Sequence, residues 1–137
     1  MPETMPLSNG KTFNFRQFAI STAFGAAILN SIVYLIGSAA GASFIINQGG
    51  AKKITLVMVF TITLIPLLIA GGVTNAIGKR SASFLTKAPV IGLILGLVSA
   101  SVPIQAAETT GTAVALAANH VISSIFWFLG LRKATNS

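Results

Sequence analysis

The stretch ITLVMVFTITLIPLLIAGGVTNAIG, residues 54–78, decides the fold because it contains no charged side chain. A helix of this length extends for roughly 37 Å at about 1.5 Å per residue, which exceeds the roughly 30 Å of a bilayer's hydrocarbon core. The stretch therefore predicts a transmembrane helix. Pro66 near its middle predicts a kink, because a proline leaves the carbonyl about one turn earlier, near Ile62, without its amide partner.

Working outward, three more apolar stretches predict spans at residues 18–40, 88–104 and 111–131. We expect an all-α integral membrane bundle of four transmembrane helices, residues 18–131, between tails at 1–17 and 132–137, with a loop at 41–53 and a turn at 103–110. The first stretch also follows basic residues, as a signal peptide does. Its length exceeds the roughly 7–15 apolar residues of a signal sequence, which favours a span.

The composition supports this reading. Of the 137 residues, 53% are hydrophobic and only 8% are charged, against roughly 25% in soluble domains. The formal net charge is +7, but the basic residues lie between the apolar stretches and form no basic face. The expected partner is therefore the lipid bilayer, and no nucleic acid is expected. The absence of cysteine excludes disulfides and thiolate metal sites.

The basic residues also predict the topology. An N-terminus in the cytoplasm puts seven basic residues inside and only Lys52 and Lys53 outside. This bias predicts that both termini are cytoplasmic, in a multi-pass protein of the cell inner (plasma) membrane. Lipid headgroups are the expected contacts of the basic residues that follow the second and fourth spans, Lys79, Arg80, Arg132 and Lys133.

A polar cluster is predicted near the middle of the membrane. His120, the only histidine, lies in the fourth span with Asn119, Ser123 and Ser124, and Asn30 lies in the middle of the first span. We expect His120 to be neutral, to face the bundle interior and to hydrogen-bond with Asn30 directly or through a water. The cluster is either a structural clasp between helices or a site for a ligand, a cofactor or a proton-linked step.

Other chemistry finds little support in the sequence. No set of nucleophile, base and orienting group and no metal-ligand motif is present, so we expect no catalytic residues, no metal, no cofactor and no enzymatic activity. Glu108, the only acid beyond the first few residues, falls in the external turn. Proton coupling through an intramembrane carboxylate is therefore not expected.

Gly92, Gly96 and Ala100 recur every four residues and predict a helix-packing face. This stripe motivates our main functional expectation, an accessory or structural subunit that packs in a homo-oligomer or a larger membrane complex. The alternative is a transporter or channel for a small compound, kinked at Pro66. Its polar lining would consist of Asn30, Thr61, Thr63, His120 and Ser123. A less favoured alternative is a haem- or pigment-binding subunit centred on His120.

Three motifs carry a resemblance over residues 18–133. They are AAILNSIVYLIG at 26–37, GKRS at 78–81 and ALAANHVIS at 115–123. With four apolar spans, the chain resembles small bacterial four-helix membrane proteins catalogued as a domain of unknown function. The resemblance implies a membrane location and four helices, without an activity. The chain departs from the family pattern at Asn119, where we associate the family with an apolar residue such as Met.

Overall fold

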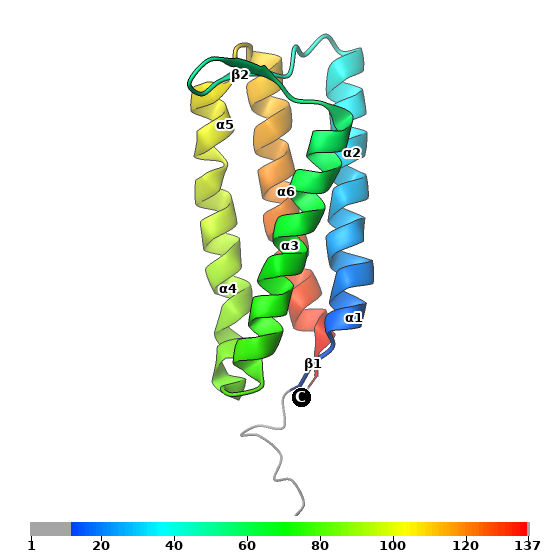
Figure 1. Ribbon diagram of the computed structural model, residues 1–137, viewed down its shortest axis with the longest axis vertical. Helices are drawn as coiled ribbons and strands as arrows, with labels where there is room; N and C mark the ends of the chain where they lie inside the picture. Colours follow the sequence, from blue (N-terminus) through cyan, green and yellow to red (C-terminus); the bar gives the residue numbers. More distant parts are fainter. Residues whose placement is uncertain (1–11, 137) are drawn as a thin grey trace, which may run out of the picture.

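The computed structural model describes residues Thr12–Asn136, so residues 1–11 of the predicted N-terminal tail and Ser137 lie outside the described part. Within the described part, four helical segments are long and apolar enough to cross a membrane, and they stand side by side (Figure 1). These segments are Phe15–Ala39, Leu56–Gly78, Ala82–Ala106 and Thr110–Ala134. The prediction of four apolar spans is confirmed.

The first span begins earlier than predicted. It consists of α1 (Phe15–Gln17), a π-helical stretch η2 (Phe18–Ala23) and α2 (Phe24–Ala39). Asn14 caps its start by accepting a hydrogen bond from the Gln17 backbone N–H at 3.0 Å, which satisfies one of the free donors at a helix N-terminus.

The two ends of the described chain lie together. Strand β1 (Thr12–Phe13) pairs antiparallel with β4 (Thr135–Asn136). We call this the terminal end of the bundle. The turn between α3 (Leu56–Gly78) and α4 (Ala82–Ser99) lies at the same end (Figure 1).

The opposite end carries a small hairpin where a loop was predicted. Strands β2 (Ile45–Asn47) and β3 (Ala51–Lys53) pair antiparallel. Gly49 and Gly50 in the turn have φ of +71° and +129°, which glycine adopts without a steric penalty. The Glu108 backbone N–H donates to the Ile45 carbonyl at 2.9 Å, so the hairpin is tied to the connection before α6. We call this the hairpin end.

The third and fourth spans are longer than predicted. The third begins at Ala82 instead of residue 88 and continues through α5 (Ser101–Ala106), so Lys87 lies on a helix. Pro103, predicted in a turn, is the third residue of α5, where the missing N–H of proline would have no helical partner in any case. Helix α6 (Thr110–Ala134) includes Arg132 and Lys133, which were assigned to the C-terminal tail.

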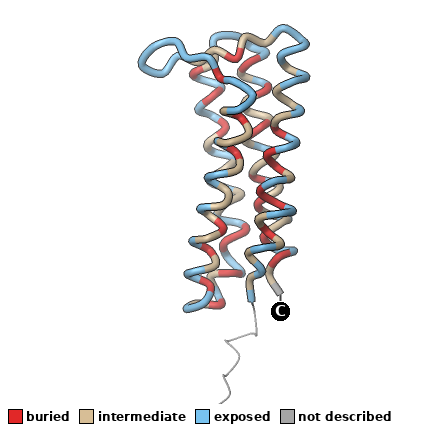
Figure 2. Tube along the Cα trace, turned by 45° about the vertical axis from the view of Figure 1, so that its right-hand side comes forward, coloured by how far each residue is buried: buried red, intermediate tan, exposed pale blue. Residues whose placement is uncertain are grey.

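The helices do not pack evenly. Helix α2 packs against α3 and α6, and α4 packs closely along α6, whereas α3 and α4 meet near their connecting turn and diverge from there (Figure 1). Buried residues recur among exposed ones along all four spans (Figure 2). Two apolar clusters form: one at the terminal end around Phe18, Trp127 and Leu131, and one at the hairpin end around Phe44 and Val59.

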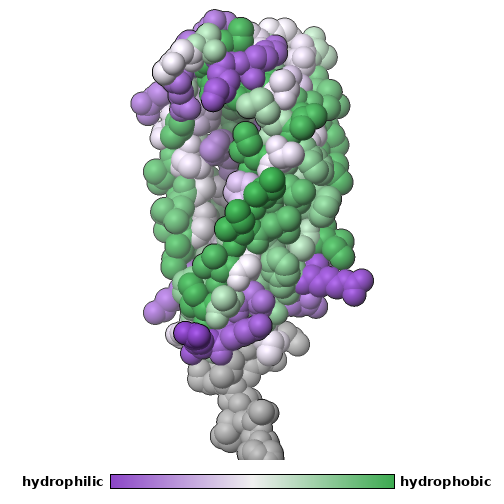
Figure 3. All heavy atoms as spheres, in the orientation of Figure 1, coloured by the Kyte–Doolittle hydropathy of each residue, from purple (hydrophilic) through white to green (hydrophobic). Residues whose placement is uncertain are grey.

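The outer surface is apolar. Large side chains such as Ile69 and Leu95 are more than 60% exposed. Hydrophobic residues cover the middle of the visible face, and hydrophilic residues gather at its two ends (Figure 3). A water-soluble bundle of this size would not expose such a band, so the surface is that of a protein surrounded by lipid.

The small-residue stripe packs inside the chain. A Cβ atom added at Gly92 would overlap the Trp127 indole, and one added at Gly96 would overlap the Ser124 hydroxyl. Ala100 is buried where α4 meets α5. Gly92 and Gly96 thus let α4 approach α6 of the same chain. The stripe is therefore a helix-packing face, as predicted, but it packs within the chain and gives no support for a partner.

We predict that Gly92→Ala lowers the free energy of unfolding by about 1–3 kcal/mol, because the new methyl group displaces the Trp127 side chain. Gly72→Ala is the matched control, since nothing lies within 4 Å of a Cβ at Gly72. Unfolding by denaturing detergent in mixed micelles measures both. Equal stability of the two variants would show that the contact is not tight.

Candidate functional site

A large cavity opens where α3 and α4 diverge. Its volume is about 840 Å³, and it is lined by α3, α4, α5 and α6, with Asn30 of α2 and residues of the hairpin. Between the apolar surfaces of α3 and α4 the molecule is hollowed in the half nearer the hairpin, and hydrophilic atoms are visible inside (Figure 3). The hollow faces outward from the bundle, where the bilayer lies.

The cavity runs along much of the membrane depth. On α6 its lining extends from Leu116 to Trp127, about 16 Å of helix within a hydrocarbon core of roughly 30 Å. Gln48, an exposed residue of the hairpin turn, also lines it, so the cavity reaches the hairpin end. At the terminal end the apolar cluster around Phe18 and Leu131 fills the interior.

The walls are mostly apolar, with several uncharged polar groups among them. No Asp, Glu, Lys or Arg occurs among the described residues that line the cavity. The polar lining residues come from all four spans and the hairpin: Asn30, Gln48, Thr63, Thr74, Ser99, Asn119, His120, Ser123 and Ser124. The structure thus brings all five residues of the predicted midplane cluster to one cavity. Whether they bind a ligand stays a prediction.

Asn30 joins three helices. Its side chain is only 1% exposed. The Nδ2 group donates to the Thr63 hydroxyl of α3 at 3.0 Å and to the Ser123 hydroxyl of α6 at 2.9 Å. No described residue hydrogen-bonds its Oδ1, although that atom is buried. Asn30 is therefore a clasp between helices and also leaves one acceptor free.

Asn119 lies one turn before Ser123 on α6 and is 7% exposed. Its Oδ1 is the other buried side-chain atom for which the described residues supply no hydrogen-bond partner. A buried carbonyl group without a donor costs free energy, about 1–3 kcal/mol in typical cases. Such a group in a cavity wall is suited to a donor brought by a ligand or a water.

His120 is paired with Ser99 of α4. The Ser99 Oγ lies 2.7 Å from His120 Nδ1 and donates to the Gly96 carbonyl at 2.6 Å. The predicted direct hydrogen bond between Asn30 and His120 is wrong, because each side chain has found nearer partners. Thr61 was also expected in the lining but does not contribute. Its hydroxyl donates to the Val57 carbonyl of its own helix at 2.9 Å.

Ser99 was not predicted as a site residue. It follows Gly96 by three residues and therefore shares the face of the small-residue stripe. That spacing could have placed Ser99 on the same helix face as the glycines. It could not place Ser99 opposite His120, because the sequence does not show that α4 faces α6. Within Thr12–Asn136, no group of three or more His, Cys, Asp or Glu side chains lies close enough together to hold a metal ion.

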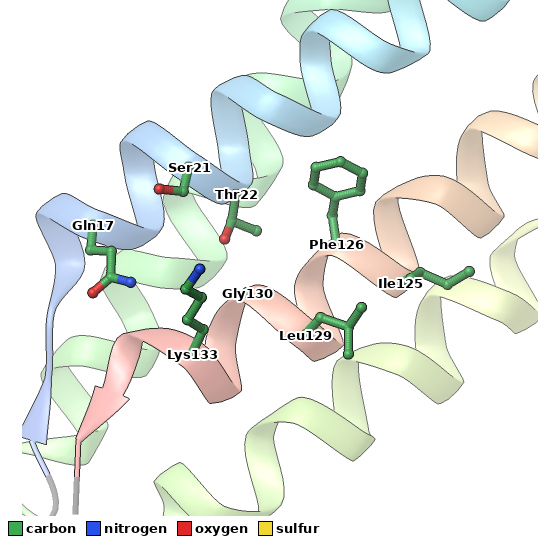
Figure 4. A pocket seen from close by; sticks show the side chains of 8 residues that line it. All are labelled: Gln17, Ser21, Thr22, Ile125, Phe126, Leu129, Gly130 and Lys133. Carbon is green, nitrogen blue, oxygen red and sulfur yellow. The ribbon is translucent and has the colours of Figure 1, made fainter.

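A smaller groove of about 240 Å³ lies between η2 and α6 near the terminal end (Figure 4). Its apolar part is formed by Ile125, Phe126 and Leu129, and its polar part by Gln17, Ser21 and Lys133. The Lys133 side chain extends from α6 toward η2, where Thr22 and Ser21 lie (Figure 4).

The other residues predicted to contact lipid headgroups also lie near the terminal end. Lys79 and Arg80 are exposed in the α3–α4 turn. The Arg132 guanidinium lies 5.2 Å from the centre of the Phe128 ring. Headgroup binding by these side chains stays a prediction.

We predict that Asn30→Leu lowers the free energy of unfolding by about 1–2 kcal/mol, because it removes two hydrogen bonds between helices. Ser31→Ala is the control, since the Ser31 hydroxyl donates only to the Ala27 carbonyl of its own helix. Detergent-induced unfolding compares the two. If Ser31→Ala costs as much as Asn30→Leu, the interhelical bonds do not stabilise the bundle.

Comparison with known proteins bears on the family alone. A family model described as "Family of unknown function (DUF6069)" matches residues 11–137, nearly the whole chain. No curated protein and no solved structure matches. The resemblance inferred from the sequence is confirmed: the chain belongs to DUF6069, a family of unknown function.

Proposed function

We propose that the protein binds a small, uncharged, mainly apolar compound in the cavity between α3 and α4, as a carrier or receptor within the membrane. The observation that carries this proposal is the cavity itself. A typical ligand pocket has about 300–1,000 Å³, apolar walls and a few convergent polar groups, and this cavity has about 840 Å³ and such walls. The hollow between α3 and α4 lets a compound dissolved in the bilayer reach the site from the side.

A carrier or receptor fits better than an open channel. A channel needs a continuous path, whereas the cluster around Phe18, Trp127 and Leu131 fills the bundle at the terminal end. Pro66 lines the cavity within α3, and a proline inside a helix is a place where the helix can bend.

The other functional expectations receive less support. Gly92 and Gly96 pack against Trp127 and Ser124 of the same chain. This packing removes the main argument for an accessory subunit in a homo-oligomer or larger complex. A haem- or pigment-binding subunit would have to rely on His120 alone, because the sequence contains no second histidine and no cysteine. The Ser99 hydroxyl donates to a carbonyl, so it is not activated by His120 as a nucleophile, and we propose no enzymatic activity.

We further propose that the terminal end faces the cytoplasm, in the plasma membrane. Exposed basic residues of the α3–α4 turn and of the end of α6 gather at the terminal end, while Lys52 and Lys53 lie on the hairpin. This distribution agrees with the positive-inside rule. The cavity then reaches toward the outer side of the membrane.

The orientation can be measured directly, because the chain has no cysteine of its own. We predict that Gly49→Cys in the hairpin turn reacts with a membrane-impermeant maleimide on intact cells. Ser83→Cys near the start of α4 should react only after permeabilisation. The reverse pattern would place the hairpin end in the cytoplasm and overturn the orientation.

Ligand binding can be followed through Trp127, the only tryptophan, which lines the cavity. We predict that bromonaphthalene, a neutral apolar compound, quenches its fluorescence saturably in liposomes. Ala70→Phe should weaken this binding about tenfold, equivalent to about 1.4 kcal/mol, because the ring occupies part of the cavity. Ala76→Phe is the control: it is exposed on the same helix and does not line the cavity.

Quenching of Trp127 fluorescence by brominated phospholipid is the reference, because it measures how often lipid chains alone contact Trp127. If bromonaphthalene quenches no more than this lipid does, or if both phenylalanine variants bind alike, the cavity is not a ligand site. Crosslinking in the same liposomes identifies a second copy seated between α3 and α4. Such a crosslink would favour the subunit hypothesis over the proposed function.

A further inference from the structure

The free hydrogen-bonding groups of the cavity wall indicate which kind of ligand fits, and His120 is one of them. A serine hydroxyl has one proton, and that of Ser99 is donated to the Gly96 carbonyl at 2.6 Å. The contact of 2.7 Å between Ser99 Oγ and His120 Nδ1 therefore requires the proton to be on Nδ1. In the neutral ring, the form favoured inside a membrane without a partner carboxylate, Nε2 is then an acceptor.

Two more acceptors lie in the same cavity. The Oδ1 atoms of Asn30 and Asn119 are buried, and no described residue donates to either of them. Both residues line the cavity, as does His120. Within the described part of the chain, no hydrogen bond engages His120 Nε2. Three acceptors of the cavity wall therefore lack donors.

Three donors of the wall are already used by the protein. The Trp127 indole N–H donates to the Ala88 carbonyl at 3.0 Å. The hydroxyls of Thr74 and Ser124 donate to carbonyls of their own helices, at 2.8 and 2.7 Å. None of these three donors therefore satisfies a free acceptor, and unmet buried acceptors are costly until something donates to them.

The free acceptors lie at a similar depth. Asn119 and His120 are neighbours on α6, and Asn30 is held by Ser123, one turn further along. The separation along the helix axis is about 6 Å. Toward the terminal end the wall becomes apolar around Leu67, Ala88 and Trp127. A ligand in this cavity contacts acceptors near the middle of the bundle and an apolar surface on the side of the terminal end.

We propose that the compound bound in this cavity is an uncharged hydrogen-bond donor, an alcohol, phenol or N–H compound. Its O–H or N–H groups lie against Asn30, Asn119 and His120, and its apolar part extends toward Trp127. This inference rests on the proposed function and specifies its ligand class. Ions are disfavoured because the described lining residues include no acid and no Lys or Arg.

The test compares two probes that differ in one donor: ω-bromodecanol and its methyl ether. The bromine of each quenches Trp127 on contact, and affinities are expressed per probe dissolved in the liposome membrane. We expect the alcohol to bind about tenfold more tightly than the ether, the effect of one additional hydrogen bond. The ether keeps the chain and the oxygen but donates nothing.

Asn119→Leu identifies the acceptor. No described residue hydrogen-bonds its Oδ1, so the substitution removes this acceptor without breaking a hydrogen bond to it. We expect it to remove most of the alcohol's advantage and to leave ether binding unchanged. Asn75→Leu is the matched control, because Asn75 lies on α3 outside the lining and should keep the full preference.

The outcomes separate this inference from the proposed function. Equal binding of alcohol and ether would keep the binding site and overturn the donor requirement. An alcohol preference that survives in Asn119→Leu and in His120→Phe would overturn the assignment of the acceptors. If neither probe quenches Trp127 more than brominated phospholipid does, the cavity binds no such compound and both proposals fall.

Discussion

The close contact between α4 and α6 is the constraint on which the rest of the structure depends. At Gly92 and Gly96 the two helices approach until the side chains of Trp127 and Ser124 lie directly on the α4 backbone. Lipid chains are as apolar as the helix surfaces, so association in a membrane depends on such close packing and on hydrogen bonds. Helix α4 packs along α6, and Asn30 of α2 links α3 to α6 through hydrogen bonds. Because α3 and α4 are held by different neighbours, they separate from each other, and the cavity lies between them.

The same arrangement explains why polar groups gather there. Each hydroxyl in a membrane helix can bond a carbonyl one turn earlier, as Ser31 and Thr74 do, and then needs no partner. The amides of Asn30 and Asn119 have no such local solution for their oxygens. Both oxygens are buried without a partner among the described residues, and a donor on the proposed ligand would satisfy them.

Much of the architecture could be predicted from the sequence, and less of the site. The four spans follow from the length of the apolar stretches, and Asn30, His120 and Ser123 stood out as polar residues within them. The direct Asn30–His120 hydrogen bond was wrong because equal depth does not give the rotation of each helix about its axis. Ser99 was missed for the same reason. The third span was predicted too short because Lys87 and Pro103 were taken as boundaries, although a lysine can extend from a helix surface and a proline fits a first turn.

By itself the sequence determined that the described part of this protein lies in a membrane and how many times it can cross it. The length of an apolar stretch can be read directly along the chain, without knowledge of contacts between helices. It also supplied the residues that interrupt the apolar surface. Only the tertiary structure decided which helices touch. It turned the glycine stripe of α4 inward onto α6 instead of toward a partner, paired Ser99 with His120, and gathered the polar residues of separate spans around one cavity. These results depend on contacts between residues far apart in the chain, which no local pattern specifies.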